Sequence, residues 1–217
     1  ALFAVGGPSK NGSLRQVHLM RAGQPGVTID LYDFLLGGDT GQDLRLQDGD
    51  TIQIGYGSLP NAIVANFKDK RNLGVHSELL TDGMVELMKK GVINNTQKTL
   101  NRGKTVATFC MGHRSTYEYI HDNPSFEFRT IDYTNNPLII AKNHKMTAIN
   151  SALEIDLTGQ ATAESLGHNF YSGIGGQADF MRGAILAPGG KSILALPSTS
   201  HDGKMSRIVP LLSEGAG

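Results

Sequence analysis

From about residue 53 onward, short apolar runs alternate with segments in which apolar side chains recur at helical spacing. Residues 51–54 and 105–110 have the composition of buried strands, whereas residues 61–70 and 82–90 place apolar side chains three or four positions apart. Alternation of this kind predicts an α/β fold with an open, mostly parallel sheet flanked by helices. The pattern limits the greater part of the chain to that class.

The remaining elements after residue 110 are short and are bounded by turn-forming residues. We expect helices at residues 115–121 and 138–141 and a third beginning at 178–182, with strands at 126–131, 146–149, 153–157, 192–196 and 207–212. We also expect two antiparallel pairs among them. Residues 146–149 should pair with 153–157, and residues 192–196 should pair with 207–212 across a turn at 201–203.

The first 52 residues have a different pattern, which predicts a small β-rich unit. The elements expected in it are strands at 13–21 and 27–31, a turn at 22–26, a helix at 30–36, and a strand, turn and strand within 44–52. No spacer rich in Pro, Gly or Ser separates this unit from the rest near residues 50–53. The chain therefore divides into residues 1–52 and 53–217, joined directly.

Composition excludes several classes of protein. Lys plus Arg and Asp plus Glu both total 20, so no overall basic charge favours nucleic acid as a partner. No apolar stretch approaches the roughly 20 residues that cross a bilayer, so no membrane association is expected. Cys110 is the single cysteine, and the histidines show no metal-ligand spacing, so we expect neither a disulfide within the chain nor a metal site. These features fit a cytoplasmic protein, and a periplasmic protein without disulfides is the alternative.

Glu78 is the first candidate catalytic residue. It lies in residues 74–84, where an apolar strand end is followed by a helix start at Thr81 to Gly83. A carboxylate placed there can attack a thioester carbonyl and form a mixed anhydride. The alternative is a solvated carboxylate that the nearby helix dipole favours. His76, two residues earlier, either tunes this carboxylate or is an ordinary core or surface histidine.

A glycine-rich turn at residues 172–177 opens the predicted helix at 178 and is the second candidate feature. Gly173, Gly175 and Gly176 allow close approach of the backbone to a ligand, and N–H groups at a helix start can bind an oxyanion. The glycine spacing fits neither a P-loop nor a dinucleotide-binding fingerprint. The alternative is a tight turn without a ligand.

Longer motifs carry a resemblance to a known family. They lie at residues 53–62, 74–78, 82–85, 150–160, 171–183, 195–199 and 206–210. On these motifs, residues 53–217 resemble the C-terminal domain of the acetyl-CoA hydrolase/transferase family, above all its 4-hydroxybutyrate and butyrate CoA-transferases. The resemblance implies transfer of CoA between an acyl-CoA and a small carboxylate through a glutamyl-CoA thioester.

The resemblance also implies roles for particular residues. Glu78 is expected to be the nucleophile, Gly173, Gly175, Gly176 and Gln177 to form the loop that meets the oxyanion and CoA, and Gly55 and Gly57 to form a second glycine loop. No metal or redox cofactor is implied, because CoA is a substrate. The family carries an α/β domain before this one and further residues after it. We therefore expect a domain truncated at its C-terminus, which acts with a missing N-terminal domain or as a homo-oligomer.

The first 52 residues resemble a different family, the soluble-ligand-binding β-grasp repeat of polysaccharide export proteins. The motifs that carry this resemblance lie at residues 5–8, 11–15, 29–36 and 46–50. Two interpretations of the whole chain follow. It is either a CoA-transferase domain behind a partial β-grasp unit, active or inactive, or a β-grasp binding module with a non-catalytic passenger. The join near residue 52 is natural, engineered or an artefact of assembly, and the sequence leaves these alternatives open.

Overall fold

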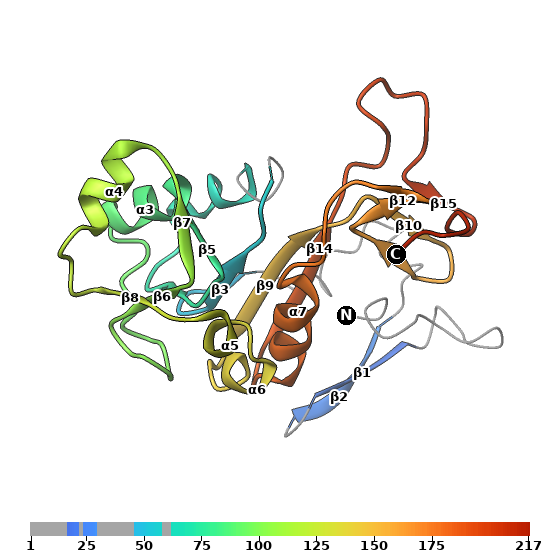
Figure 1. The fold of residues 1–217 in the computed structure, drawn as a ribbon. Helices are drawn as coiled ribbons and strands as arrows, with labels where there is room; N and C mark the ends of the chain where they lie inside the picture. The colour runs from blue at the N-terminus through green and yellow to red at the C-terminus, as the bar shows by residue number, and fades with distance from the viewer. Residues whose placement is uncertain (1–16, 22–23, 30–45, 58–61) are drawn as a thin grey trace. The chain divides into compact units, whose positions relative to one another are not determined.

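The computed structural model describes residues 17–21, 24–29, 46–57 and 62–217, which fall into two compact units (Figure 1). The larger unit comprises Leu46–Ser151 and Gly175–Ala195, and it contains both cores of buried apolar side chains. The smaller unit comprises Ala1–Arg45, Ala152–Ile174 and Leu196–Gly217.

A four-stranded sheet forms the centre of the larger unit. Its order is β14 (Lys191–Ala195), β9 (Met146–Ser151), β3 (Thr51–Ile54) and β4 (Gly74–Val75). All three pairings are parallel, and every residue of β3 is buried. Parallel strands covered on both faces are rich in apolar and β-branched residues, as these are. The structure thus confirms the predicted α/β class.

Two short parallel ladders extend the larger unit beyond β4. They pair β5 (Leu79–Thr81) with β7 (Phe109–Met111) and β6 (Thr105–Ala107) with β8 (Phe126–Phe128). A bridge between His76 and Val106 connects β4 with β6. The prediction of one strand at 105–110 is wrong, because the N–H groups of Thr108 and Phe109 both donate to the carbonyl of Glu78, at 2.9 and 3.1 Å. The chain therefore changes partner at residue 108.

Helices cover the sheet of the larger unit. They are η2 (Phe67–Asp69), α3 (Asp82–Lys89), α4 (Arg114–Ile120), α5 (Ile131–Thr134), α6 (Pro137–Ile140) and α7 (Gln177–Leu186). Gly183 of α7 lies against Ile140 so closely that a β-carbon would overlap it, and this allows α6 and α7 to pack together (Figure 1). The helix expected at 61–70 is interrupted, since only 62–64 and η2 are helical among its described residues.

The smaller unit consists of short strands. They are β10 (Glu154–Asp156), β11 (Ala161–Thr162), β12 (Ser165–Leu166), β13 (Asn169–Phe170) and β15 (Ile208–Val209), together with the hairpin β1 (Val17–Arg21) and β2 (Gln24–Ile29). β10 pairs with β11 antiparallel and with β15 parallel.

Both predicted antiparallel pairs after residue 146 are therefore wrong. Residues 146–149 lie in β9 and residues 192–195 lie in β14, and these two strands are parallel neighbours. The chain enters β14 from α7. The expected turn at 201–203 is present, but its hairpin ends at the bridge between Thr199 and Ser206. Beyond this bridge the chain joins β10 as β15.

Some predictions for the N-terminal segment are tested only in part. Strands are present at 17–21 and 24–29, as antiparallel partners, so the predicted turn is wrong for residues 24–26, which belong to β2. A turn is present at 48–49. The predicted helix at 30–36, the motifs at 5–8 and 11–15 and the loop residues 58–60 lie outside the described residues. Within the described part of the chain, none of the helices is sufficiently long and apolar to span a membrane.

Candidate active site

Glu78 lies beyond the carboxyl end of β4, one of the parallel strands of the four-stranded sheet. It follows β4 by three residues and immediately precedes β5, and its side chain is half-buried. Ligands of open α/β sheets bind outside the carboxyl ends of the strands. The geometry thus places Glu78 where this class of fold carries out its chemistry.

Asn135 holds the Glu78 carboxylate in place. Its Nδ2 donates a hydrogen bond of 2.8 Å to Oε2 of Glu78, and the Asn135 residue is only 7% exposed. Among the described residues, Oε1 of Glu78 accepts no hydrogen bond, and the buried Oδ1 of Asn135 has no partner. One carboxylate oxygen is therefore fixed while the other is free to react. The sequence analysis missed Asn135, which directly follows α5, a helix that the sequence did not predict.

Gly176 meets the same carboxylate from the start of α7. A β-carbon at Gly176 would overlap Oε2 of Glu78 and Nδ2 of Asn135. The φ angle of Gly176 is −73°, so this position requires glycine for space and not for a left-handed backbone. The unpaired N–H groups of the first helical turn and the helix dipole favour negative charge at this end of α7. The structure thus brings together Glu78, Asn135 and Gly176.

His76 is a core residue behind this group. It is fully buried, with its Nε2 2.9 Å from the carbonyl oxygen of Thr134 and its ring 6.3 and 6.1 Å from the rings of Tyr133 and Phe180. Burial, together with the charge of Lys98, lowers the pKa of His76 to about 4. The imidazole is neutral at pH 7, and the proton sits on Nε2 because a carbonyl only accepts.

Lys98 and Asn95 complete the hydrogen bonding of β4 on the side that faces away from β3. Oδ1 of Asn95 accepts from the N–H of Val75 at 2.9 Å, and Nζ of Lys98 donates to the carbonyl oxygens of Val75 and Lys104, both at 2.7 Å. Lys98 is 3% exposed, and burial lowers its pKa to about 7. A β-carbon at Gly74 would overlap the Lys98 stem, so the glycine makes room for it. The sequence analysis singled out neither Lys98 nor Asn95.

The other residues of the two predicted glycine loops differ in how closely their surroundings are packed. Gly55 follows β3, and a β-carbon there would overlap Oδ1 of Asn150, whereas Gly57 adopts a φ of 139°. Gly175 is exposed and borders open space, and Gln177 is the first residue of α7. Gly173 is exposed in the smaller unit.

Other titratable groups of the larger unit have structural roles. Asp82 accepts hydrogen bonds from the N–H of His113 at 2.9 Å and from the hydroxyl of Thr116 at 2.6 Å, and so caps α4. The Thr116 hydroxyl is the main cause that lowers the pKa of Asp82. Burial raises the pKa of Cys110, so this side chain is a thiol and not a nucleophilic thiolate at neutral pH. No group of three or more potential metal ligands is found among the described residues.

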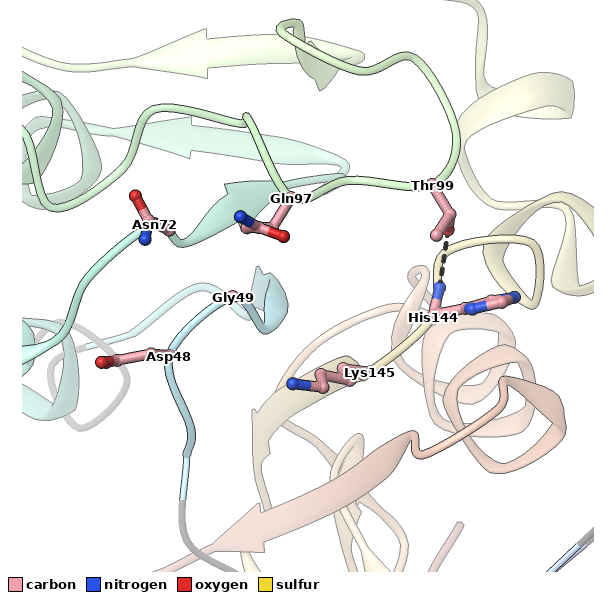
Figure 2. A pocket seen from close by; sticks show the side chains of 7 residues that line it. All are labelled: Asp48, Gly49, Asn72, Gln97, Thr99, His144 and Lys145. Atoms are coloured by element: carbon pink, nitrogen blue, oxygen red, sulfur yellow. Dashed lines mark hydrogen bonds between the residues drawn. The ribbon is translucent and has the colours of Figure 1, made fainter.

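A polar cavity of about 380 Å³ lies at the opposite edge of the sheet (Figure 2). Its lining residues precede the strands, with Asp48 and Gly49 before β3, Asn72 before β4 and Lys145 before β9. The N–H of His144 donates to Oγ1 of Thr99 at 2.9 Å across one wall. Most of its lining is exposed, and it lies at the amino ends of the strands, so it is separate from the Glu78 group.

The fold and the site together define an α/β domain that holds a carboxylate beside the glycine-capped start of a helix. Residues 112–217 match the family model described as the acetyl-CoA hydrolase/transferase C-terminal domain. The chain is also 52% identical, over 171 residues, to the 4-hydroxybutyrate coenzyme A transferase of Clostridium kluyveri. That match covers 79% of the chain and 40% of the relative. The expected resemblance to this family is confirmed.

Solved structures agree with the sequence matches. RipA from Yersinia pestis is 45% identical with a TM-score of 0.71, and the match covers 78% of this chain and 37% of that one. A 4-hydroxybutyrate CoA-transferase from Porphyromonas gingivalis is 41% identical with a TM-score of 0.68, covering 79% and 41%. The chain thus spans about two fifths of the length of the curated relative it matches. The resemblance of residues 1–52 to a β-grasp repeat stays a prediction.

Proposed function

We propose that the chain is the nucleophile-bearing domain of a CoA-transferase that moves CoA from an acyl-CoA to a small carboxylate. One observation carries this proposal: the Glu78 carboxylate is fixed through Oε2 by Asn135 and lies against Gly176 at the start of α7. The names of the relatives from Clostridium kluyveri and Porphyromonas gingivalis support the same activity. They give no support to a β-grasp module with a non-catalytic passenger.

The proposed chemistry begins with attack by Oε1 of Glu78 on the thioester carbonyl. The carbon–sulfur bond breaks, CoA leaves as a thiolate, and a mixed anhydride forms between Glu78 and the acyl group. The thiolate then attacks the glutamyl carbonyl, which releases the first carboxylate and leaves a glutamyl-CoA thioester. A second carboxylate reverses these two steps and departs as the new acyl-CoA. Glu78 is regenerated, and no electron transfer or metal ion is required.

The residues around Glu78 have separate roles in this scheme. Asn135 holds the carboxylate so that Oε1 faces the substrate, and the N–H groups at the start of α7 stabilise the oxyanion of the tetrahedral intermediates. Gly176 keeps the space that these intermediates need. By their place in the sequence, Gly173, Gly175 and Gln177 belong to the loop that contacts CoA, and Gly55 and Gly57 to a second loop. The match covers about two fifths of the relative's length, and this supports a further domain as partner; a second copy of the chain is the alternative partner that we propose.

Isotope exchange tests this proposal directly. The protein is incubated with butyryl-CoA and labelled butyrate, and the label that enters butyryl-CoA is measured by chromatography. We expect exchange in the parent protein and in Glu86→Gln, which changes an exposed carboxylate on α3, and a loss of at least about 1,000-fold in Glu78→Gln. Equal exchange in Glu78→Gln and Glu86→Gln would refute the assigned nucleophile.

A further inference from the structure

We propose that His76 is a positioning residue that joins the three segments carrying Glu78, Asn135 and Gly176. This inference rests on the proposed function and deepens it. It starts from the fact that His76 is a fully buried, polar side chain that the chemistry itself does not use. Each of its contacts reaches a different segment of the larger unit.

The first contact is to the segment that carries Asn135. Nε2 of His76 lies 2.9 Å from the carbonyl oxygen of Thr134, the last residue of α5, and Asn135 follows directly. A buried carbonyl that loses its donor costs about 1–3 kcal/mol, so this hydrogen bond restrains the backbone at the point where the Asn135 side chain begins. Asn135 in turn donates to Glu78.

The second contact is to the helix that begins at Gly176. The His76 ring packs against the ring of Phe180, with 6.1 Å between the centroids and a 59° angle between the planes. Phe180 is fully buried, and its N–H donates to the carbonyl of Gly176 at 3.0 Å, which closes the first turn of α7. The packing of the His76 ring against Phe180 thus fixes the position of the first turn of α7 relative to the Glu78 carboxylate.

The third contact is through the backbone of the strand that leads to Glu78. The N–H of His76 donates to the carbonyl of Ile52 in β3 at 3.2 Å, and the next N–H, of Ser77, donates to Val106 in β6 at 3.0 Å. His76 therefore sits at the branch point where the chain passes from one strand partner to the other. Glu78 follows two residues later.

These contacts require both properties of a neutral imidazole. The hydrogen bond to Thr134 requires a donor, and the packing against Tyr133 and Phe180 requires a flat ring. Because the pKa of His76 is lowered to about 4, the ring stays neutral with its proton on Nε2 over the working pH range. Glutamine retains only the donor at this position, and phenylalanine retains only the ring.

The test compares His76→Gln, His76→Phe and the control His144→Gln, which changes an exposed histidine at the opposite edge of the sheet. Intact-protein mass spectrometry gives the rate of glutamyl-CoA adduct formation against butyryl-CoA concentration. We expect the limiting rate of His76→Phe to fall about 100-fold, as for a misplaced reacting group, with a half-saturating concentration changed less than about threefold. His76→Gln should recover part of this loss, and the control should match the parent.

Hydrogen exchange of the backbone amides supplies a readout that needs no activity. In His76→Phe, the hydrogen-bonded amides of residues 135–136 and of Phe180 should exchange faster, while those of β6 keep the parent rate. Should the parent protein form no adduct, the proposed function fails, and the exchange pattern alone decides the role of His76. If His76→Phe does not fold, the same measurements on His76→Gln decide. Adduct rates and amide exchange of the His76 variants that equal those of His144→Gln would overturn the inference.

Discussion

Replacing Lys98 with methionine tests whether a buried amine supports the strand that leads to Glu78. Nζ of Lys98 donates to the carbonyl oxygens of Val75 and Lys104, and the residue is 3% exposed. Burial lowers its pKa from 10.5 to about 7, and the charge of Glu127 opposes this effect only in part. The folded protein therefore releases a proton that the unfolded chain retains up to about pH 10.5.

The size of the effect follows from these two pKa values. Between pH 7 and pH 10.5 the unfolded state binds more protons than the folded state, so stability rises with pH. A pKa difference of one unit corresponds to about 1.36 kcal/mol, and the Lys98 contribution to the free energy of unfolding should increase by about 2 kcal/mol between pH 7 and pH 9. Lys98→Met removes this increase and leaves two buried carbonyl groups without a donor.

Urea unfolding followed by circular dichroism at pH 7, 8 and 9 measures the effect. Lys90→Met is the matched control, because it removes an exposed lysine. From pH 7 to pH 9, the free energy of unfolding of the parent and of Lys90→Met should increase by about 2 kcal/mol more than that of Lys98→Met. If all three proteins show the same change of unfolding free energy with pH, the assigned burial of the amine is incorrect.

Three further changes give distinct results. Gly176→Ala should lower the adduct rate more than about 100-fold because the new methyl group displaces the carboxylate, whereas Gly217→Ala, whose added methyl group would meet no other atom within 4 Å, should react like the parent in the same mass-spectrometric assay. The free energy of unfolding of the parent should fall by about 2 kcal/mol from pH 7 to pH 5, because His76 is protonated there in the unfolded chain but not in the folded protein. His76→Gln should abolish this decrease, and a pH dependence of urea unfolding equal to that of the parent would contradict the reasoning. Lys145→Gly should stabilise by about 1 kcal/mol, because the φ of Lys145 is 54°, and a midpoint of thermal unfolding that does not increase would count against this.

The local pattern of the sequence predicted most helices and strands of the larger unit. The α3, α4, α6 and α7 helices lie within a few residues of their expected positions, because apolar spacing and the turn-forming residues that bound a helix are local signals. The pairing of the later strands was wrong, because β9 and β14 are distant in sequence and become neighbours only through the α7 crossover.

The sequence predicted part of the candidate site for the same reason. Glu78 and Gly176 lie in long motifs, and the structure places them against each other. Asn135 and Lys98 lie in short loops without periodicity, and their roles depend on contacts over 57 and 23 positions of the chain. No local pattern reports such contacts.

Locating the covalent adduct tests the central claim most directly. The protein is incubated with butyryl-CoA and treated with borohydride, which reduces a glutamyl thioester to an alcohol and leaves free carboxylates unchanged. Proteolysis and tandem mass spectrometry then identify the modified residue. The account predicts reduction at Glu78 alone, dependent on butyryl-CoA and abolished in Asn135→Ala. Reduction at another carboxylate, or none at Glu78 in protein shown to be folded, would contradict it.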